Sequence, residues 1–342
     1  MQGGWNQRLT LIRCIAAYSV VFLHIRFPGE LGVAINCLAR FAVPLFFMSA
    51  GYLTYECSSW MLFRRVIRNL YKLVVSCIPP LILEYMVIEH SRMPVKDYLS
   101  NIFTLEHLRH ILLLQELWIP YAWPLWFLAA MVILCVISWV CSLIWRRRPL
   151  PHRLLTLCAV ALLAAHLYWG EGRILQGLEP VESIYLRNVW LDGLPFFMLG
   201  ACMASREEQI RRRARPWLVC CGILFGCGLS LVERSHTGFL DLHLGSVIVA
   251  VNAMKAAIAW PDLGWDPARI RRLSFMGSVT FFVYVLHIPV YGLIKECSQI
   301  SIFVWIMAHP MLRPWIVAGC TTLLSLPLAG MAEYPKARRT TQ

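Results

Sequence analysis

Charged residues are scarce in this chain, and their scarcity excludes most soluble folds. Only 15% of the 342 residues are charged, whereas 58% are hydrophobic and the mean hydropathy is +0.60. A soluble domain has about 25% charged and about 45–50% apolar residues. The chain therefore lacks the polar surface that would cover an aqueous core, and the composition predicts an all-α integral membrane protein.

Acidic residues are scarcer still, with 19 against 32 basic residues and a net charge of +13. In a soluble protein this excess would indicate nucleic-acid binding. Here the arginines and lysines cluster in short segments between apolar stretches. That arrangement is typical of membrane orientation, so no nucleic-acid partner is expected.

A metal-binding or disulfide framework is not expected, although there are 13 cysteines. Most of them lie inside apolar runs, where cysteine behaves as a small hydrophobic residue. No C-x-x-C pair has the spacing of a metal site. Internal repeats, a soluble domain and a clear signal-peptide cleavage site are also missing, so residues 1–342 are expected to form one membrane domain with an uncleaved first helix.

About ten apolar stretches are long enough to cross a bilayer, which requires about 20 residues. The last stretch contains Pro310 and Pro314, and a short re-entrant piece followed by one span is the alternative for it. The predicted spans cover residues 8–26, 33–54, 69–90, 123–145, 154–170, 188–204, 216–233, 240–260, 274–296 and 301–330.

The basic residues also predict the orientation of these spans. Most of the 32 lie at the two ends of the chain or in the segments that follow spans two, four, six and eight. Basic loops face the cytoplasm, so both termini are predicted to be cytoplasmic. The longer segment 91–122 then faces outward, and its leucines alternate with charged residues at helical spacing. We expect an amphipathic helix there, on the outer membrane surface or packed within the loop.

Polar groups inside a span are costly, and each is therefore a candidate site residue. Arg13 and His24 are eleven residues apart in the first span, which places them on one helix face about 16 Å apart. His287 lies at a similar depth in the ninth span, with Tyr284 one turn earlier on the same face. Snorkelling of the arginine and structural burial of the histidines are the simpler interpretations.

Three further charged residues within the predicted spans are candidates for a supporting role. Arg40 and Asp192 are near the outer ends of the second and sixth spans, and Glu84 is in the middle of the third, after Pro79-Pro80. We expect Arg40 to form an ion pair with Asp192 or Glu84, in a supporting or a purely architectural role.

The motifs around these residues resemble the acyltransferase-3 family of membrane O-acyltransferases. The family's first helix carries an arginine followed eleven residues later by a histidine, as in Arg13 and His24. Its second helix resembles residues 43–53 (VPLFFMSAGYL), followed by an arginine-rich loop. Later motifs also match in order: residues 125–128 (LWFL), 196–200 (FFMLG) and 277–287, which end in YVLH.

The chain departs from the family pattern at two positions. Thr10 occupies a place that is often acidic in the family, and the usual Ser-Gly step is widened to Ser49-Ala50-Gly51. The first departure raises the alternative that this chain binds its donor differently or has lost activity.

The resemblance implies transfer of an acyl group, usually acetyl, from cytoplasmic acyl-CoA to a hydroxyl of an extracytoplasmic glycan or lipid-linked sugar. On this interpretation His24 acts as general base, and His287 or Tyr284 orients the acceptor or stabilises the oxyanion, with an acyl-histidine intermediate as an alternative. Ser49 is a supporting residue. The CoA phosphates are expected to bind four arginines: Arg13, Arg64, Arg65 and Arg68.

The expected protein is thus a multi-pass enzyme of the cytoplasmic (inner) membrane, with acetyl-CoA or another acyl-CoA as co-substrate and no tightly bound cofactor or metal. A small-solute transporter is the alternative from another class, since charged groups at mid-depth also suit transport. A catalytically inactive membrane partner is a third interpretation, and the sequence does not fix the oligomeric state.

Overall fold

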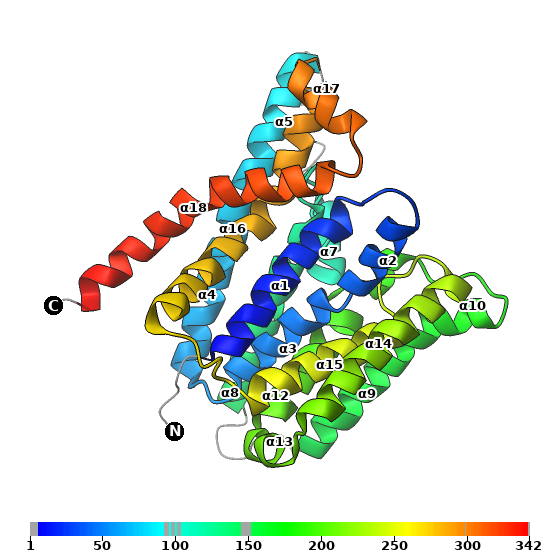
Figure 1. The fold of residues 1–342 in the computed structure, drawn as a ribbon, viewed down its shortest axis with the longest axis vertical. Coiled ribbons are helices and arrows are strands. Elements are labelled where there is room, and N and C mark those ends of the chain that lie inside the picture. The colour runs from blue at the N-terminus through cyan, green and yellow to red at the C-terminus, as the bar shows by residue number, and fades with distance from the viewer. Residues whose placement is uncertain are drawn as a thin grey trace.

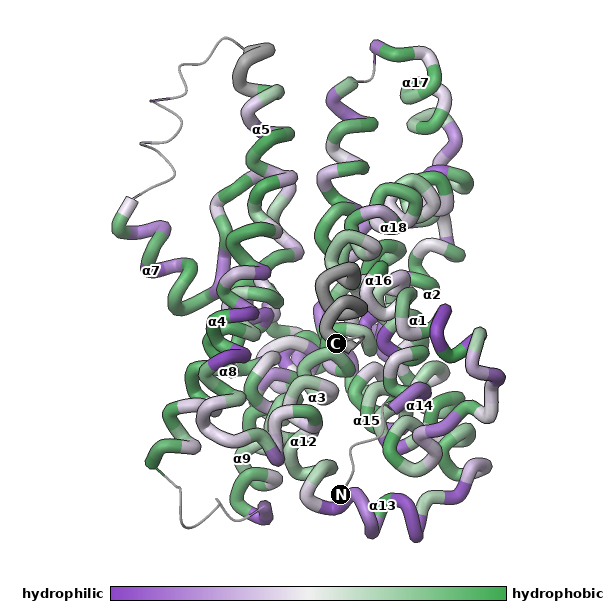
Figure 2. The backbone as a smooth tube through the Cα atoms, turned by 90° about the vertical axis from the view of Figure 1, so that its left-hand side faces the viewer, coloured by the Kyte–Doolittle hydropathy of each residue, from purple (hydrophilic) through white to green (hydrophobic). Residues whose placement is uncertain are grey.

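The chain is all-helical in a computed structural model, which describes residues 6–91, 96, 100, 104–144, 152–297 and 299–340. Within these ranges the chain forms helices and turns, with no strand. Hydrophobic residues line the lengths of the helices, and hydrophilic residues gather in segments such as α13 (Glu207–Arg213), as Figure 2 shows. This distribution is that of a protein whose helices are solvated by lipid.

The first half of the described chain begins with a capped helix. The side chain of Asn6 accepts a hydrogen bond from the backbone N–H of Leu9 at 2.7 Å, and this contact starts α1. The helices of this half are α1 (Gln7–His24), α2 (Gly29–Ala39), α3 (Ala42–Thr54), α4 (Ser59–Ser76), α5 (Ile78–Ser91), α7 (Leu105–Leu114), η1 (Trp123–Leu125) and α8 (Trp126–Ile144).

The second half includes two short π-helices, each of which continues directly into an α-helix or follows one. A π-helix inserts an extra residue into a turn and is often found at functional sites. The helices are α9 (His152–Leu167), η2 (Tyr168–Gly172), α10 (Arg173–Leu175), α11 (Ser183–Leu186), η3 (Val189–Gly193), α12 (Leu194–Ala204), α13, α14 (Pro216–Thr237), α15 (Leu244–Ala259), α16 (Pro267–Glu296), α17 (Ser301–Ala308) and α18 (Arg313–Thr340).

Among the described residues, seven helical segments are long and apolar enough to cross a membrane. Two shorter apolar helices, Val189–Ala204 and Leu244–Ala259, coincide with the sixth and eighth predicted spans. The first predicted span coincides with α1, which has 18 residues. The prediction of a polytopic helical protein is therefore confirmed, while the count of ten spans and the cytoplasmic termini stay predictions. The last stretch is divided at residues 309–312 into α17 and α18.

The arginine-rich segment after the second span is a helix and not a loop, so that expectation was wrong. Ser58 caps α4 by accepting a hydrogen bond from the N–H of Met61 at 3.4 Å. Leu62 and Val66 are buried on one side of α4. The arginines of this segment lie on the remaining, more exposed sides, so an amphipathic helix appears in the sequence as a basic interruption between apolar runs.

The amphipathic outer helix expected within 91–122 corresponds to α7. Thr104 caps it, and no residue of α7 is buried. Leu105, Leu108 and Leu112 are all more than half exposed. This exposure fits a helix that lies on the membrane surface rather than one packed inside a loop, and the surface location stays a prediction. Residues 92–95, 97–99 and 101–103 of this segment lie outside the described residues.

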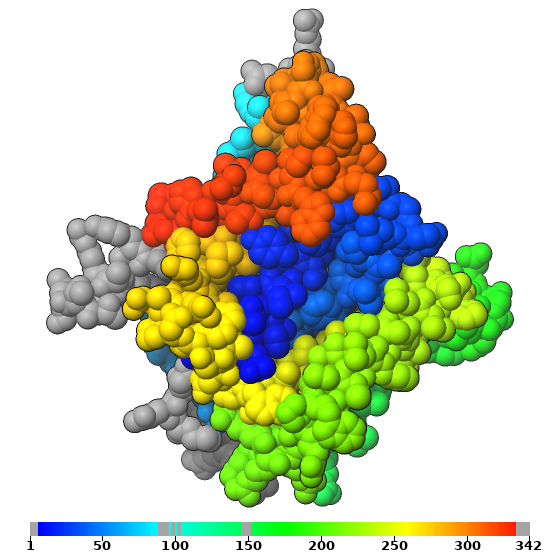
Figure 3. Space-filling model, viewed as in Figure 1, coloured from blue at the N-terminus to red at the C-terminus, as the bar shows by residue number. Residues whose placement is uncertain are grey.

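The helix α1 lies in the middle of the molecule (Figure 1) and contacts α2, α3, α15, α16 and α18. Figure 3 shows that part of its surface stays visible between α18 and α16 on one side and α14 on the other. The main hydrophobic core surrounds this helix, and it includes Leu45, Phe47 and Met254. A central helix that is still partly open is a suitable element for a site that binds a ligand.

Two glycines allow α3 and α12 to approach backbone to backbone. A Cβ atom on Gly200 would lie 1.9 Å from the carbonyl oxygen of Met48, and one on Gly51 would lie 1.9 Å from the carbonyl oxygen of Phe197. Both distances are far below van der Waals contact. Gly51, in the widened Ser49-Ala50-Gly51 sequence, therefore still permits a close helix crossing. This gives a physical reason for a glycine at position 51.

We expect Gly200→Ala to lower the thermal stability of the protein, because the added methyl group must push α3 and α12 apart at a cost of about 1–3 kcal/mol or more. Gly228→Ala is the matched control, since nothing lies within 4 Å of a Cβ placed there. The measurement is the melting temperature of the detergent-purified variants. Equal melting temperatures for Gly200→Ala and Gly228→Ala would show that the crossing is not tight.

Candidate functional site

The parallel packing of α1 against α16 builds the candidate site. A Cβ on Gly277 would lie 3.0 Å from the Cγ2 atom of Thr10, and Cys14 Sγ lies 3.9 Å from Thr280 Oγ1. Further along both helices, the ring centroids of His24 and His287 are 5.4 Å apart. Residue numbers rise together on the two helices, so they run in the same direction. The predicted equal depth of the two histidines has this geometric basis.

The tautomer of His287 is defined by one hydrogen bond. Its Nδ1 lies 2.7 Å from the carbonyl oxygen of Tyr284. A carbonyl oxygen only accepts, so Nδ1 carries the proton and Nε2 of the neutral ring keeps its lone pair. This Nε2 atom is buried and has no hydrogen-bond partner among the described residues. An unsatisfied buried acceptor is costly, and a bound hydroxyl group would satisfy it.

Tyr284 holds His287 in place but has no free hydroxyl group. Its Oη donates to the carbonyl oxygen of Pro124. The ring of Tyr284 meets that of Phe127 edge-on at 6.0 Å, and Phe127 lies 4.6 Å from Phe47. The aromatic motifs of the second, fourth and ninth predicted spans thus form one cluster behind His287. Because its hydroxyl group is engaged, Tyr284 has a positioning role in this arrangement rather than an oxyanion-stabilising one.

A chain of hydrogen bonds connects the end of α1 to an ion pair. The side-chain amide of Asn36 donates to the carbonyl oxygen of Leu23 at 2.8 Å, and Arg40 Nη2 donates to Asn36 Oδ1 at 3.4 Å. Arg40 Nη1 lies 2.6 Å from Asp241 Oδ1. The other carboxylate oxygen of Asp241 accepts from the hydroxyl group of Ser183. These hydrogen bonds fix the backbone directly before His24.

The predicted ion pairs of Arg40 with Asp192 or Glu84 were therefore wrong, because its salt-bridge partner is Asp241. Asp192 is buried in η3 near this pair and interacts electrostatically with Arg40 and Arg187. Its Oδ1 atom has no hydrogen-bond partner within the described ranges. Glu84 is buried in α5, which packs against α16. Hydropathy gives the depth of a charge, but it does not tell which helices are neighbours.

Positive charge surrounds the C-terminal end of α1. Arg26, Arg40 and Arg187 all lie close enough to interact electrostatically with His24. The guanidinium carbons of Arg26 and Arg40 lie 4.4 Å and 4.5 Å from the ring centre of Phe239. Aromatic stacking of this kind holds a guanidinium in place while its outer nitrogens stay available. The cluster is suited to stabilising negative charge.

Arg13 is exposed on α1, and in the part of the chain that the structure describes no hydrogen bond or ion pair is recorded for it. An unpaired cation at this depth is costly in lipid, so its position on the open side of α1 is consistent with a ligand-binding role. The hydroxyl group of Ser49 donates to the carbonyl oxygen of Phe46 in its own helix at 2.9 Å. Among the described residues, no hydrogen bond joins Ser49 to His24 or His287.

The three arginines of α4 differ in availability. Arg65 Nη2 donates to the carbonyl oxygen of Leu53 at 2.8 Å and ties α4 to the end of α3. Arg64 and Arg68 are exposed. One turn after Arg68, the ammonium group of Lys72 lies 4.5 Å from the ring centre of Phe281 on α16. The basic face of α4 therefore leads toward the helix that carries His287.

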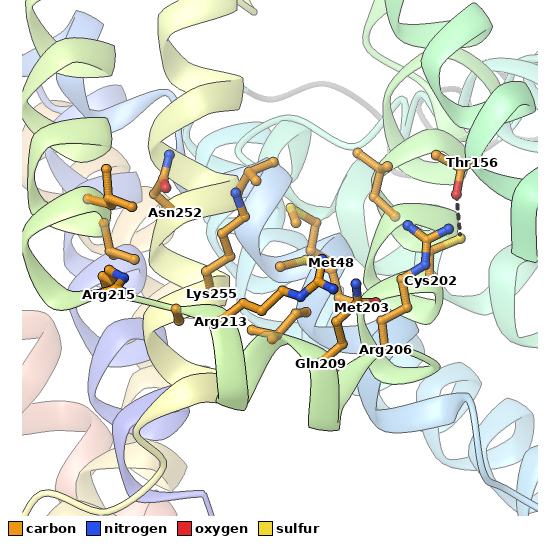
Figure 4. A pocket seen from close by; sticks show the side chains of 16 residues that line it. Met48, Thr156, Cys202, Met203, Arg206, Gln209, Arg213, Arg215, Asn252 and Lys255 are labelled. Carbon is orange, nitrogen blue, oxygen red and sulfur yellow. Dashed lines mark hydrogen bonds between the residues drawn. The ribbon is translucent and has the colours of Figure 1, made fainter.

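A second basic site was not found from the sequence. A cavity of about 500 Å³ lies between α9, α12, α13, α14 and α15. Both apolar and cationic side chains line it (Figure 4). Its walls include Met48, Leu199 and Val251, and its cations are Arg206, Arg213, Arg215 and Lys255. From the sequence, the three arginines served only to orient the spans and Lys255 lies within the eighth predicted span, because a linear sequence does not show that they converge on one cavity.

Comparison with known proteins agrees with the geometry. No curated protein and no solved structure matches the chain. One family model, described as an acyltransferase domain, matches residues 6–332, which is nearly the whole chain. That range contains α1, α16 and every candidate site residue discussed above. The chain thus belongs to the acyltransferase-3 family of membrane acyltransferases.

Proposed function

We propose that this protein transfers an acyl group, and specifically acetyl, from cytoplasmic acyl-CoA to a hydroxyl group of an extracytoplasmic glycan or lipid-linked sugar. The observation that carries the proposal is the buried, unpartnered Nε2 of His287, 5.4 Å ring to ring from His24. A neutral imidazole nitrogen with a fixed tautomer is the group that a hydroxyl nucleophile requires as its base.

The defined tautomer favours His287 as the general base, and this assignment exchanges the roles expected from the sequence. The acceptor hydroxyl gives its proton to Nε2, and its oxygen bonds to the thioester carbonyl carbon. The carbon–sulfur bond then breaks, and the CoA thiolate takes the proton back from the imidazolium. His24 is half-buried, whereas His287 is fully buried, so a ligand that enters meets His24 first. His24 would position the acceptor.

The arginines near His24 would stabilise the tetrahedral oxyanion. Negative charge develops on the thioester oxygen as the hydroxyl attacks, and fixed positive groups in a site of low dielectric lower the energy of that state. Arg40 is neutralised by Asp241, so Arg26 and Arg187, which form no salt bridge among the described residues, supply such charge. They would also attract the phosphate of a lipid-linked sugar, which supports this class of acceptor.

The donor is proposed to enter along Arg13, Arg64 and Arg68. Guanidinium groups match phosphate oxygens, and all three are exposed and free of salt bridges within the described residues. The packing of Lys72 against Phe281 supports a path from α4 to α16. Residue 281 precedes His287 by six positions, about 9 Å along a helix, which a pantetheine arm spans.

The proposed location is the cytoplasmic membrane, with both chain termini inside. The basic residues near the start of α1 and on α4 support cytoplasmic donor binding by the positive-inside rule. With this orientation the histidine pair lies in the outer half of the membrane. One site would then take its donor from the inside and its acceptor from the outside, without moving either substrate fully across.

We expect His287→Gln to lower kcat by about 10²–10⁴-fold with little change in KM, since this is the contribution of a positioned base. His24→Asn should instead raise the KM for the acceptor more than it lowers kcat. The measurement is release of free CoA thiol from acetyl-CoA by the purified protein with a panel of glycan acceptors. Acetyl-CoA binding, measured in parallel, should stay unchanged in both variants.

The opposite split, with kcat lost in His24→Asn and retained in His287→Gln, would return the base role to His24. Release of one CoA per protein in the absence of acceptor would instead indicate an acyl-histidine intermediate. A folded protein that neither binds nor consumes acetyl-CoA would refute the enzymatic proposal and favour solute transport.

We expect the double variant Arg64→Gln/Arg68→Gln to raise the KM for acetyl-CoA about tenfold, because charge-assisted contacts to phosphate are lost. Arg65 is left unchanged because it ties α4 to α3. Arg206→Gln/Arg213→Gln is the matched control, since it removes two arginines from the cavity of Figure 4. Initial rates over a range of acetyl-CoA concentrations provide the measurement.

The control variant should keep the KM of the unmodified protein. A reversed result, with KM raised only by Arg206→Gln/Arg213→Gln, would move the donor site from α4 to the cavity between α12 and α15. Unchanged KM in both double variants would show that neither basic region binds the phosphates.

A further inference from the structure

Three side chains with metal-binding atoms converge away from the histidine pair. Glu171 belongs to η2, Glu233 to the last turns of α14, and His243 directly precedes α15. One ligand atom from each lies within 4.8 Å of the other two. His243 Nδ1 and Glu171 Oε1 are 3.5 Å apart. Glu171 lies 62 residues before Glu233, and His243 follows Glu233 by ten, so the sequence shows no metal-binding spacing motif for them.

Two of these atoms lack the partners that buried polar groups normally have. The side chain of His243 is 1% exposed and that of Glu171 is 10% exposed. His243 Nδ1 and Glu171 Oε1 are both buried without a hydrogen bond in the described structure, because their 3.5 Å approach does not have hydrogen-bond geometry. Leaving two such groups unsatisfied is costly unless a further species binds them.

The carboxylates also lack a compensating cation. Among the described residues, no arginine or lysine lies within salt-bridge distance of Glu171 or Glu233. Two backbone N–H groups, that of Gly245 at 2.9 Å from Oε2 and that of Leu244, donate to the Glu233 carboxylate. Two carboxylates that face each other in a poorly solvated place repel, and a bound cation relieves that repulsion.

We propose that Glu171, Glu233 and His243 bind a divalent transition-metal ion, with Zn²⁺ as the best chemical match. One imidazole and two carboxylates are ligands that Zn²⁺ accepts, with bonds of about 2.0–2.2 Å. Tetrahedral bonds of this length separate neighbouring ligand atoms by about 3.3 Å, close to the 3.5 Å between His243 and Glu171. Three protein ligands leave the fourth position for water or a substrate oxygen.

The fold gives an ion access to this place. A cavity of about 440 Å³ is lined by Glu171 and Glu233 together with His236 and Thr237. The π-helix η2 turns Glu171 toward α14, and such insertions often re-aim one side chain at a functional site. An ion bound here would join η2, α14 and the start of α15 at a point two residues from Asp241, the partner of Arg40.

A metal-free alternative makes a different prediction. A protonated His243 paired with Glu171 would account for the 3.5 Å contact without any ion. In that case added metal neither binds in stoichiometric amount nor stabilises the protein. The proposal does not depend on acyl transfer, so it is tested without measuring that activity.

The experiment uses the full-length protein, purified in detergent, stripped with EDTA and dialysed. It is then titrated with Co²⁺ and with Zn²⁺. We expect one tightly bound ion per chain by mass spectrometry of the metal content, a visible Co²⁺ absorption band that Zn²⁺ abolishes, and a rise in melting temperature with Zn²⁺. An ion that binds only the folded state must raise the melting temperature.

Glu171→Gln and His243→Asn should each weaken Zn²⁺ affinity at least tenfold, because even outer partners of metal ligands contribute 10–100-fold. His236→Asn and Glu182→Gln are the controls: the first lies in the same cavity and the second is exposed nearby. Both should bind as the unmodified protein does. Absence of stoichiometric binding in the unmodified protein overturns the proposal, as does equal affinity in Glu171→Gln, His243→Asn and the controls.

Discussion

The close, parallel packing of α1 on α16 is the constraint on which the rest of the site depends. Thr10 fills the place opposite Gly277, where a Cβ atom would approach its methyl group to 3.0 Å. An acidic side chain at position 10, as in many relatives by the family pattern, would face the same glycine. Thr10 is therefore compatible with the helix contact that aligns His24 with His287.

The hydrogen bonds at the C-terminal end of α1 explain why buried charges occur there. Burying Arg40 is tolerable because Asp241 neutralises it and Asn36 occupies a further donor. The same asparagine binds the carbonyl oxygen directly before His24. Removing either charge would leave the other buried and unpaired. The ion pair thus acts on His24 through the backbone of α1, although in the described structure neither charge forms a hydrogen bond with that imidazole.

Hydropathy predicted where helices lie, and counting along them predicted that His24 and His287 share a depth. Both properties can be read along the sequence, because the lipid bilayer imposes them on each helix. Which helices contact each other cannot be read along the sequence in this way. Asp241 was missed as the partner of Arg40 because it lies at the start of a predicted span and no periodicity links it to α2. The arginines of α4 were assigned to a loop because an amphipathic helix at a membrane boundary resembles a polar linker.

The two π-helices of the described chain share one feature. Each holds one buried acid, Glu171 in η2 and Asp192 in η3, and each acid has a carboxylate oxygen without a hydrogen-bond partner in the described chain. A regular α-helix would turn these residues through a different angle, toward lipid or an apolar neighbour. The insertion costs helix regularity, and such strain persists only where the surroundings require that side chain direction.

Asp241 connects the two π-helices: it interacts with Asp192 of η3 and lies two residues before His243, which is near Glu171 of η2. A cation bound at Glu171 and His243 would thus hold the loop that carries Asp241, and through Arg40 the end of α1, in the position that the histidine pair requires.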